Sequence, residues 1–109
     1  MRFFAWLVVV PVLLGPVLAQ AHTPVCVCTL QDGQIVCKGG FHDGSRAQGV
    51  RIDVIAYDET LLVTGKLDAQ SRFAFARPDR PFYVLMDVGP GEIAEVDWTD
   101  IAGLGGSPH

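Results

Sequence analysis

The sequence lacks the short motifs of the common hydrolases. It contains no Gly-x-Ser-x-Gly elbow and no His-Glu-x-x-His pair, so the nucleophile of α/β-hydrolases and the usual zinc-protease site are both absent. Its serines, Ser45, Ser71 and Ser107, carry no local signature of a nucleophile. A catalytic cysteine–histidine pair is the alternative that these absences do not test, because the two residues of such a pair meet in space rather than in sequence. We expect no enzymatic activity.

Positive charge is also scarce. The chain has 8 Lys and Arg residues against 12 Asp and Glu, for a formal net charge of -4. Because an acidic domain repels the phosphates of nucleic acid, we expect no nucleic-acid partner. The acidity is compatible with cation binding, and equally with the solubility of an ordinary exported domain.

The sequence has a single long apolar run, Phe3–Leu18, and no later segment that could span a membrane. The run is shorter than the ~20 residues of a spanning helix, and it is followed by small residues at Ala19 and Ala21, as signal peptidase requires. We therefore expect residues 1–21 to be a signal peptide, the mature chain to begin at His22, and the protein to be periplasmic. If the leader is retained, the protein is membrane-anchored instead.

No segment carries a sustained helical period, and Gly, Pro and Asp interrupt the chain at intervals of roughly eight to twelve residues. The expected strands are Val25–Gln31, Gln34–Lys38, Val50–Tyr57, Leu61–Lys66, Arg72–Ala76, Phe82–Asp87 and Ile93–Trp98. This pattern predicts an all-β fold, a seven-stranded antiparallel sandwich with the two-sheet architecture of immunoglobulin-like domains, over residues 22–101, with a frayed tail at 102–109. The apolar stripes predict a core that contains Val54, Phe73, Phe75, Phe82 and Val84.

The first two strands flank Asp32-Gly33, a strong signal for a two-residue type I′ hairpin turn. Such a turn pairs Cys28 with Cys37 in a non-hydrogen-bonded position, where opposed Cα atoms approach to ~4.5 Å, close enough for a disulfide. Cys26 lies two residues before Cys28, on the same face and diagonal to Cys37. One face of the hairpin therefore carries all three sulfur atoms.

Three interpretations of these cysteines stay open. In the first, a Cys28–Cys37 disulfide staples a small exported domain and Cys26 is a spare thiol. In the second, the three thiolates bind a soft metal ion, with or without His22. In the third, Cys26 forms a redox-active or intermolecular disulfide.

Two histidines are further candidate ligands. After cleavage, the free amine and the imidazole of His22 can chelate one metal ion, although a terminal histidine is often only a mobile end. Pro24 has no backbone N–H, so nickel coordination through successive amides is unavailable at that position. His42 follows the second strand beside Asp43, which can orient an imidazole toward a metal; the alternative is a solvated turn residue.

Several motifs together resemble the transthyretin-like sandwich of bacterial exported proteins, and their order is similar to the small accessory components of nickel and cobalt energy-coupling-factor transporters. The resemblance covers roughly Gly39–Glu95. It rests on Gly40-Phe41-His42-Asp43-Gly44-Ser45, Ala47, Gly49-Val50, Gly65-Lys66-Leu67-Asp68, Phe73, Phe75, Pro78 and Met86-Asp87-Val88-Gly89-Pro90-Gly91. Where those components tend to have a histidine after the last turn, this chain has Glu92, a harder ligand that is less suited to nickel or copper.

The resemblance implies a periplasmic accessory protein that binds nickel or cobalt, with copper as a further candidate, and presents the ion to membrane transporter components. The candidate metal ligands are His22, Cys26, Cys28, Cys37, His42 and Glu92. The alternative is a structural or interaction module without metal, whose sheet edge or loops dock on a membrane partner.

Overall fold

The structure of the chain is a computed structural model, which describes residues 23–104. Its elements, in chain order, are β1 (Pro24–Gln31), β2 (Gln34–Phe41), β3 (Arg51–Ala56), β4 (Leu61–Lys66), β5 (Arg72–Ala76), β6 (Phe82–Gly89), β7 (Glu92–Asp97) and a 3-10 helix, η2 (Trp98–Asp100). Within these residues no helix has the length and apolar character needed to cross a membrane. The predicted signal peptide lies outside the described residues.

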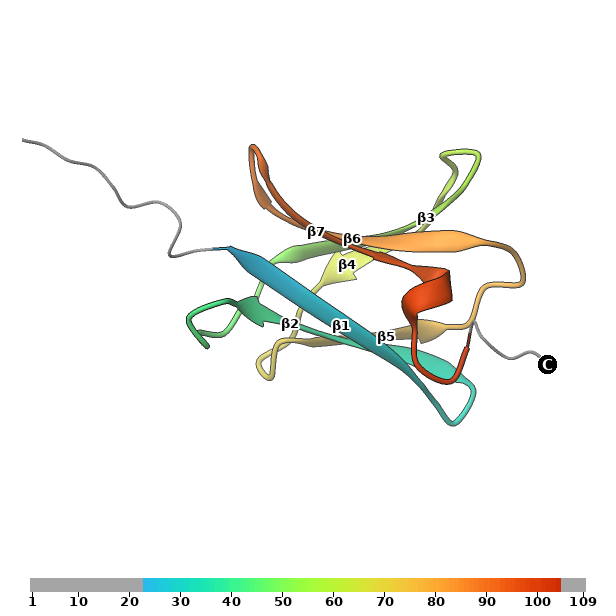
Figure 1. Cartoon of the computed structure of the whole chain (residues 1–109), viewed down its shortest axis with the longest axis horizontal. Coiled ribbons are helices and arrows are strands. Elements are labelled where there is room, and N and C mark those ends of the chain that lie inside the picture. The colour runs from blue at the N-terminus through green and yellow to red at the C-terminus, as the bar shows by residue number, and fades with distance from the viewer. Residues whose placement is uncertain (1–22, 105–109) are drawn as a thin grey trace, which may run out of the picture.

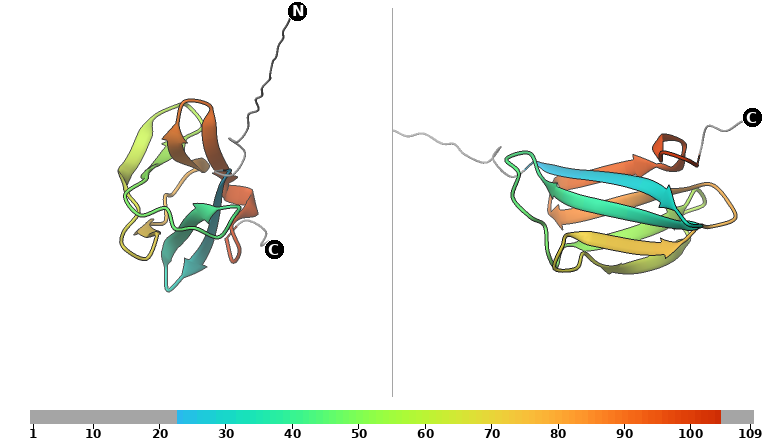
Figure 2. Two further views of the ribbon diagram at one scale, coloured as in Figure 1. Left: turned by 90° about the vertical axis from the view of Figure 1, so that its left-hand side faces the viewer. Right: turned by 90° about the horizontal axis from the view of Figure 1, so that it is seen from below.

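The strands form two antiparallel sheets that face each other as two layers (Figures 1 and 2). One sheet has the order β1-β2-β5 and the other the order β4-β3-β6-β7. The prediction of an all-β, seven-stranded antiparallel sandwich is thereby confirmed. The strand β6, whose sequence is apolar on both faces, lies between β3 and β7, as expected for a central strand.

The core lies between the sheets and is built from alternate residues of the central strands. Ile52 and Val54 of β3 and Val84 and Met86 of β6 are each 0% exposed. Of the predicted core residues, Val54, Phe75, Phe82 and Val84 are buried. Phe73 is only partly buried and packs at the margin of the core, where its ring lies over Gly65: a Cβ atom at Gly65 would come within 2.4 Å of it.

The β1–β2 hairpin has the predicted turn and the predicted register. Asp32 and Gly33 have φ values of 52° and 83°, the positive values that a type I′ turn needs. Cys28 pairs with Cys37 across the two strands. The strand β2 continues to Phe41, beyond the predicted end at Lys38, because Gly39 and Gly40 still pair with β1.

The end of the domain differs from the prediction. The segment 101–104 is packed against β1 rather than frayed: the Leu30 N–H donates to the Ala102 carbonyl oxygen at 2.9 Å, and Ile101 and Leu104 are buried. The packed domain therefore extends to Leu104, beyond the predicted boundary at residue 101, because apolar side chains there reach the core. Residues 105–109 lie outside the described residues.

Candidate functional site

The cysteines of the β1–β2 hairpin form one group on the inner face of their sheet. The Sγ atoms of Cys26, Cys28 and Cys37 lie within 4.8 Å of one another. Cys28 and Cys37 are buried, at 2% and 0% exposure, and Cys26 is partly buried. Among residues 23–104 this is the one group of three histidine, cysteine or carboxylate side chains close enough to hold a single ion.

A disulfide joins Cys28 and Cys37, whose Cα atoms are 3.9 Å apart. This is the geometry of the first interpretation, in which the pair staples the hairpin. A sulfur atom in a disulfide is not a thiolate, so the soft-metal interpretation requires that the bond first be reduced.

Cys26 is the free cysteine among the described residues. It pairs with Gly39 and packs against the core, and this burial raises the pKa of its thiol to about 11. Near neutral pH the side chain is therefore a protonated thiol. Because the thiolate is the form that attacks electrophiles and binds metal ions, this cysteine is a weak nucleophile in the folded protein.

His42 follows β2, in the loop that leads to β3. Its backbone N–H donates to the Thr23 carbonyl oxygen at 2.9 Å, which extends the β1–β2 pairing by one residue beyond Pro24 and Phe41. The His42 side chain is exposed. The neighbouring Asp43 carboxylate shapes the loop, since its Oδ1 atom accepts hydrogen bonds from the backbone N–H and the hydroxyl of Ser45, at 2.9 and 2.7 Å.

Two further predicted ligands are His22 and Glu92. His22 lies outside the described residues. Glu92 is the first residue of β7 and is half-buried; it pairs with Gly89 in the other sheet. The β6–β7 turn, the start of β1 and the β2–β3 loop all lie at one end of the sandwich (Figures 1 and 2).

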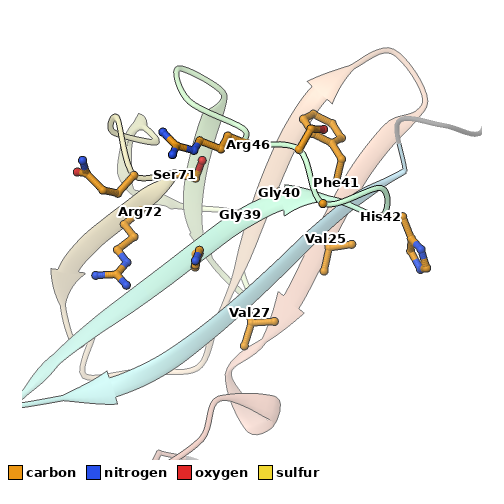
Figure 3. Close-up of a pocket in the computed structure, with 13 residues that line it drawn as sticks. Val25, Val27, Gly39, Gly40, Phe41, His42, Arg46, Ser71 and Arg72 are labelled. Atoms are coloured by element: carbon orange, nitrogen blue, oxygen red, sulfur yellow. The ribbon is translucent and has the colours of Figure 1, made fainter.

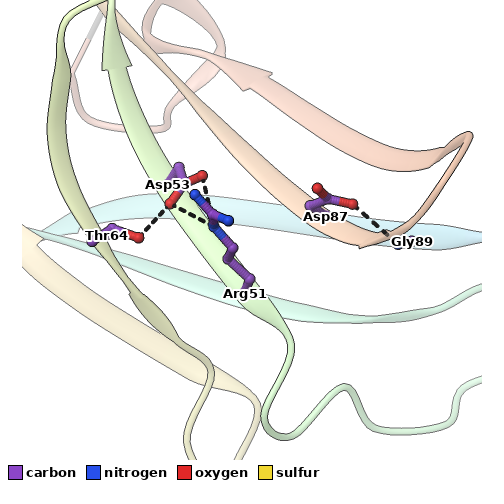
Figure 4. A network of polar contacts seen from close by, with 5 residues as sticks. All are labelled: Arg51, Asp53, Thr64, Asp87 and Gly89. Atoms are coloured by element: carbon purple, nitrogen blue, oxygen red, sulfur yellow. Dashed lines mark hydrogen bonds and ion pairs between the residues drawn. The ribbon is translucent and has the colours of Figure 1, made fainter.

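A buried carboxylate lies on the outer side of the second sheet. Asp53 of β3, which is 6% exposed, accepts a hydrogen bond from the Thr64 hydroxyl at 2.5 Å and one from Arg51 Nε at 3.1 Å (Figure 4). The Asp87 carboxylate of β6 accepts from the Gly89 backbone N–H at 3.0 Å. These partners satisfy Asp53 within the sheet, and we assign the group a structural role.

The structure also contains a hollow that the sequence did not predict. It has a volume of about 660 Å³, and it lies over the outer face of the β1-β2-β5 sheet and the loops beside it (Figure 3). We call it the basic hollow; its lining includes Val25, Val27, Lys38, His42, Arg46 and Arg72. Its residues come from segments far apart in the chain, so only the pairing of β2 with β5 brings Lys38 and Arg72 together.

Comparisons of the chain with models of protein families, with curated proteins and with solved structures found no match. The resemblance to transthyretin-like accessory components therefore stays a prediction.

Proposed function

We propose that this chain is an exported β-sandwich that binds a nickel or cobalt ion near its mature N-terminus and presents it to components of a membrane transporter. The observation that carries the proposal is the hydrogen bond from the His42 N–H to the Thr23 carbonyl oxygen. Thr23 is bonded to residue 22, and consecutive Cα atoms are about 3.8 Å apart. A chain that begins at His22 would therefore begin beside the His42 loop.

The two histidines offer the nitrogen ligands that nickel and cobalt accept. A free amine at His22, with a reference pKa of ~7.7, loses its proton to a metal ion near neutral pH and closes a chelate with the imidazole of the same residue. The exposed imidazole of His42 supplies a third nitrogen. Because Pro24 has no backbone N–H, an amide nitrogen at the third mature position is not available to the ion. The remaining coordination positions stay open for ligand exchange with a partner.

In this proposal the cysteines are structural. The Cys28–Cys37 disulfide and the protonated Cys26 thiol leave no thiolate at neutral pH in the folded, oxidised hairpin. Glu92 begins β7 and forms no three-ligand group with the other described residues, so we give it no ligand role.

A second candidate function is that of an interaction module without metal, docking on a membrane partner. The one group of three candidate ligands among the described residues is the cysteine group, and the disulfide removes two of its thiols, so no complete metal site is present there.

Calorimetric titration of the mature protein with nickel and cobalt chloride separates the two candidates. The protein is purified without a histidine tag and begins at His22. We expect about one ion bound per chain, and His42→Gln should weaken binding about tenfold or more, which corresponds to at least ~1.4 kcal/mol. Acetylation of the N-terminal amine should weaken binding to a similar extent, because it removes one donor.

His109→Gln is the matched control, since it removes an imidazole from the other terminus and should leave the affinity unchanged. Cys26→Ser should also leave the metal affinity unchanged. Absence of binding, or a His42→Gln protein that binds like its parent, would overturn the metal proposal in favour of the interaction module. A large loss of metal affinity in Cys26→Ser would instead show that the cysteines bind the ion.

A further inference from the structure

The basic hollow concentrates positive charge on an acidic protein. The chain has 12 acidic residues against 8 basic ones, yet the lining of the hollow includes Lys38, Arg46 and Arg72 and no carboxylate. The three cations come from β2, the β2–β3 loop and β5. In Figure 3, the side chains of Arg46 and Arg72 are on one side of Val25 and Val27, and that of His42 is on the other.

Two of these cations are direct neighbours. Lys38 of β2 pairs with Arg72 of β5 in the sheet register, and both side chains are exposed. Like charges that are directly opposite each other on adjacent strands destabilise a sheet. The ion pairs found in residues 23–104 are Arg51–Asp53 and Arg80–Asp58, and neither involves a cation of the hollow.

The two carboxylates in the flanking loops are engaged with their own loops. Asp43 accepts hydrogen bonds from Ser45. Asp68 Oδ1 accepts from the backbone N–H groups of Gln70 and Arg72, at 2.8 and 3.0 Å. Neither carboxylate forms one of the ion pairs found in residues 23–104, and an anionic group from outside would relieve the repulsion between Lys38 and Arg72.

The same surface is also apolar. Val25 is 38% exposed and Val27 is 60% exposed. Val27 pairs with Lys38, which in turn pairs with Arg72, so that one row across the sheet presents an apolar side chain followed by two cations. A ligand that fits this row carries apolar and acidic groups side by side.

We propose that the basic hollow docks an extended acidic segment of a partner protein in which pairs of apolar residues alternate with pairs of acidic ones, so that each face of the segment carries both kinds. The row of Val27, Lys38 and Arg72 runs across adjacent strands, so one extended chain can contact all three side chains. The acidic groups would neutralise Lys38, Arg46 and Arg72, and the apolar groups would cover Val25 and Val27. The proposal extends the proposed function by naming a docking surface, but its test requires no metal.

The test uses mature, metal-free protein in chelator and a fluorescent, capped peptide in which pairs of glutamate alternate with pairs of valine. Fluorescence anisotropy should show binding at low salt that weakens toward 0.15 M salt, where the Debye length is ~8 Å. Lys38→Gln and Arg72→Gln should each reduce the affinity about threefold or more. Each should also raise the urea midpoint of the free protein, because it removes the repulsion between neighbouring cations.

Lys66→Gln is the matched control, since it removes an exposed cation from β4 of the other sheet and should leave peptide affinity unchanged. A peptide with lysine in place of glutamate should not bind. Equal losses in Lys66→Gln and Arg72→Gln would overturn the proposal, as would binding to phosphatidylglycerol vesicles without binding to the peptide. Because chelator is present throughout, a failure to bind the peptide does not bear on the metal proposal. A failure to bind metal likewise does not change the result for the peptide.

Discussion

Cys28 and Cys37 face each other across the β1–β2 hairpin, and a disulfide joins them on the inner face of the sheet. The bond links two strands that the Asp32-Gly33 turn already holds in register. It closes a short loop, with a sequence separation of 9 residues, so its effect on the entropy of the unfolded chain is modest.

Removal of the disulfide should lower the free energy of unfolding by about 1 to 3 kcal/mol. The variant is Cys28→Ala combined with Cys37→Ala, and urea unfolding followed by tryptophan fluorescence gives the measurement. Thiol counting on the unfolded, unreduced parent should find one free cysteine. Three free thiols in freshly isolated protein would contradict the disulfide.

The thiol of Cys26 should react slowly with iodoacetamide at pH 7 and faster as the pH approaches 11, because burial raises its pKa to about 11. The same shift should affect stability. Above pH 9.0 the unfolded chain loses the thiol proton, whereas the folded protein keeps it until the pH approaches 11. The stability that the buried, neutral thiol contributes is therefore fully present below pH 9 and is lost as the pH rises toward 11. Mass spectrometry of timed alkylations measures the first effect, and Cys26→Ser should abolish the second.

Phe75→Ala should cost about 3 to 5 kcal/mol of stability, because the ring is buried in the core. Phe75 is 4% exposed, and its ring packs edge-on against Phe82, with 6.0 Å between the ring centroids. Phe73→Ala is the comparison, since that ring is only partly buried and its loss should cost less. Urea unfolding of the two variants gives the ranking, and equal costs would mean that the two rings are equally important to the core.

Tyr57→Phe should raise the pKa of Asp97. Although burial of Asp97 opposes ionisation, hydrogen bonds from Thr99 and from the Tyr57 hydroxyl lower the pKa of this carboxyl below its usual value. Removal of the hydroxyl takes away one donor to the charged form. Carbon-13 NMR titration of the carboxyl group measures the change; an unaltered pKa would show that Thr99 alone sets it.

The sequence predicted the parts of the fold that depend on local signals. The register of Cys28 with Cys37 follows from the Asp32-Gly33 turn, which fixes the strand pairing over a short distance. The bounds of β4 and β5 also match the predicted ranges, because both strands are bounded by turn residues and carry clear alternation.

The parts that were missed depend on contacts between distant segments. Nothing local marks Leu104 as buried, because its burial comes from packing against the core of the sandwich. The basic hollow was missed for the same reason: Lys38 and Arg72 become neighbours only because β2 pairs with β5 and not with β3. Of the candidate ligands, the cysteine group was predicted from the hairpin, whereas the contact between His42 and Thr23 becomes visible only once β2 is seen to extend to Phe41.

The segment 101–104 has a consequence for self-association. The strand β1 is an edge strand of its sheet, and exposed edges are templates for pairing with another chain. The Leu30–Ala102 hydrogen bond and the bridge from Thr29 to Ala102 cover that edge at Thr29 and Leu30. A chain shortened before residue 101 would present the whole length of β1 to a second copy, so these last packed residues guard the domain against aggregation.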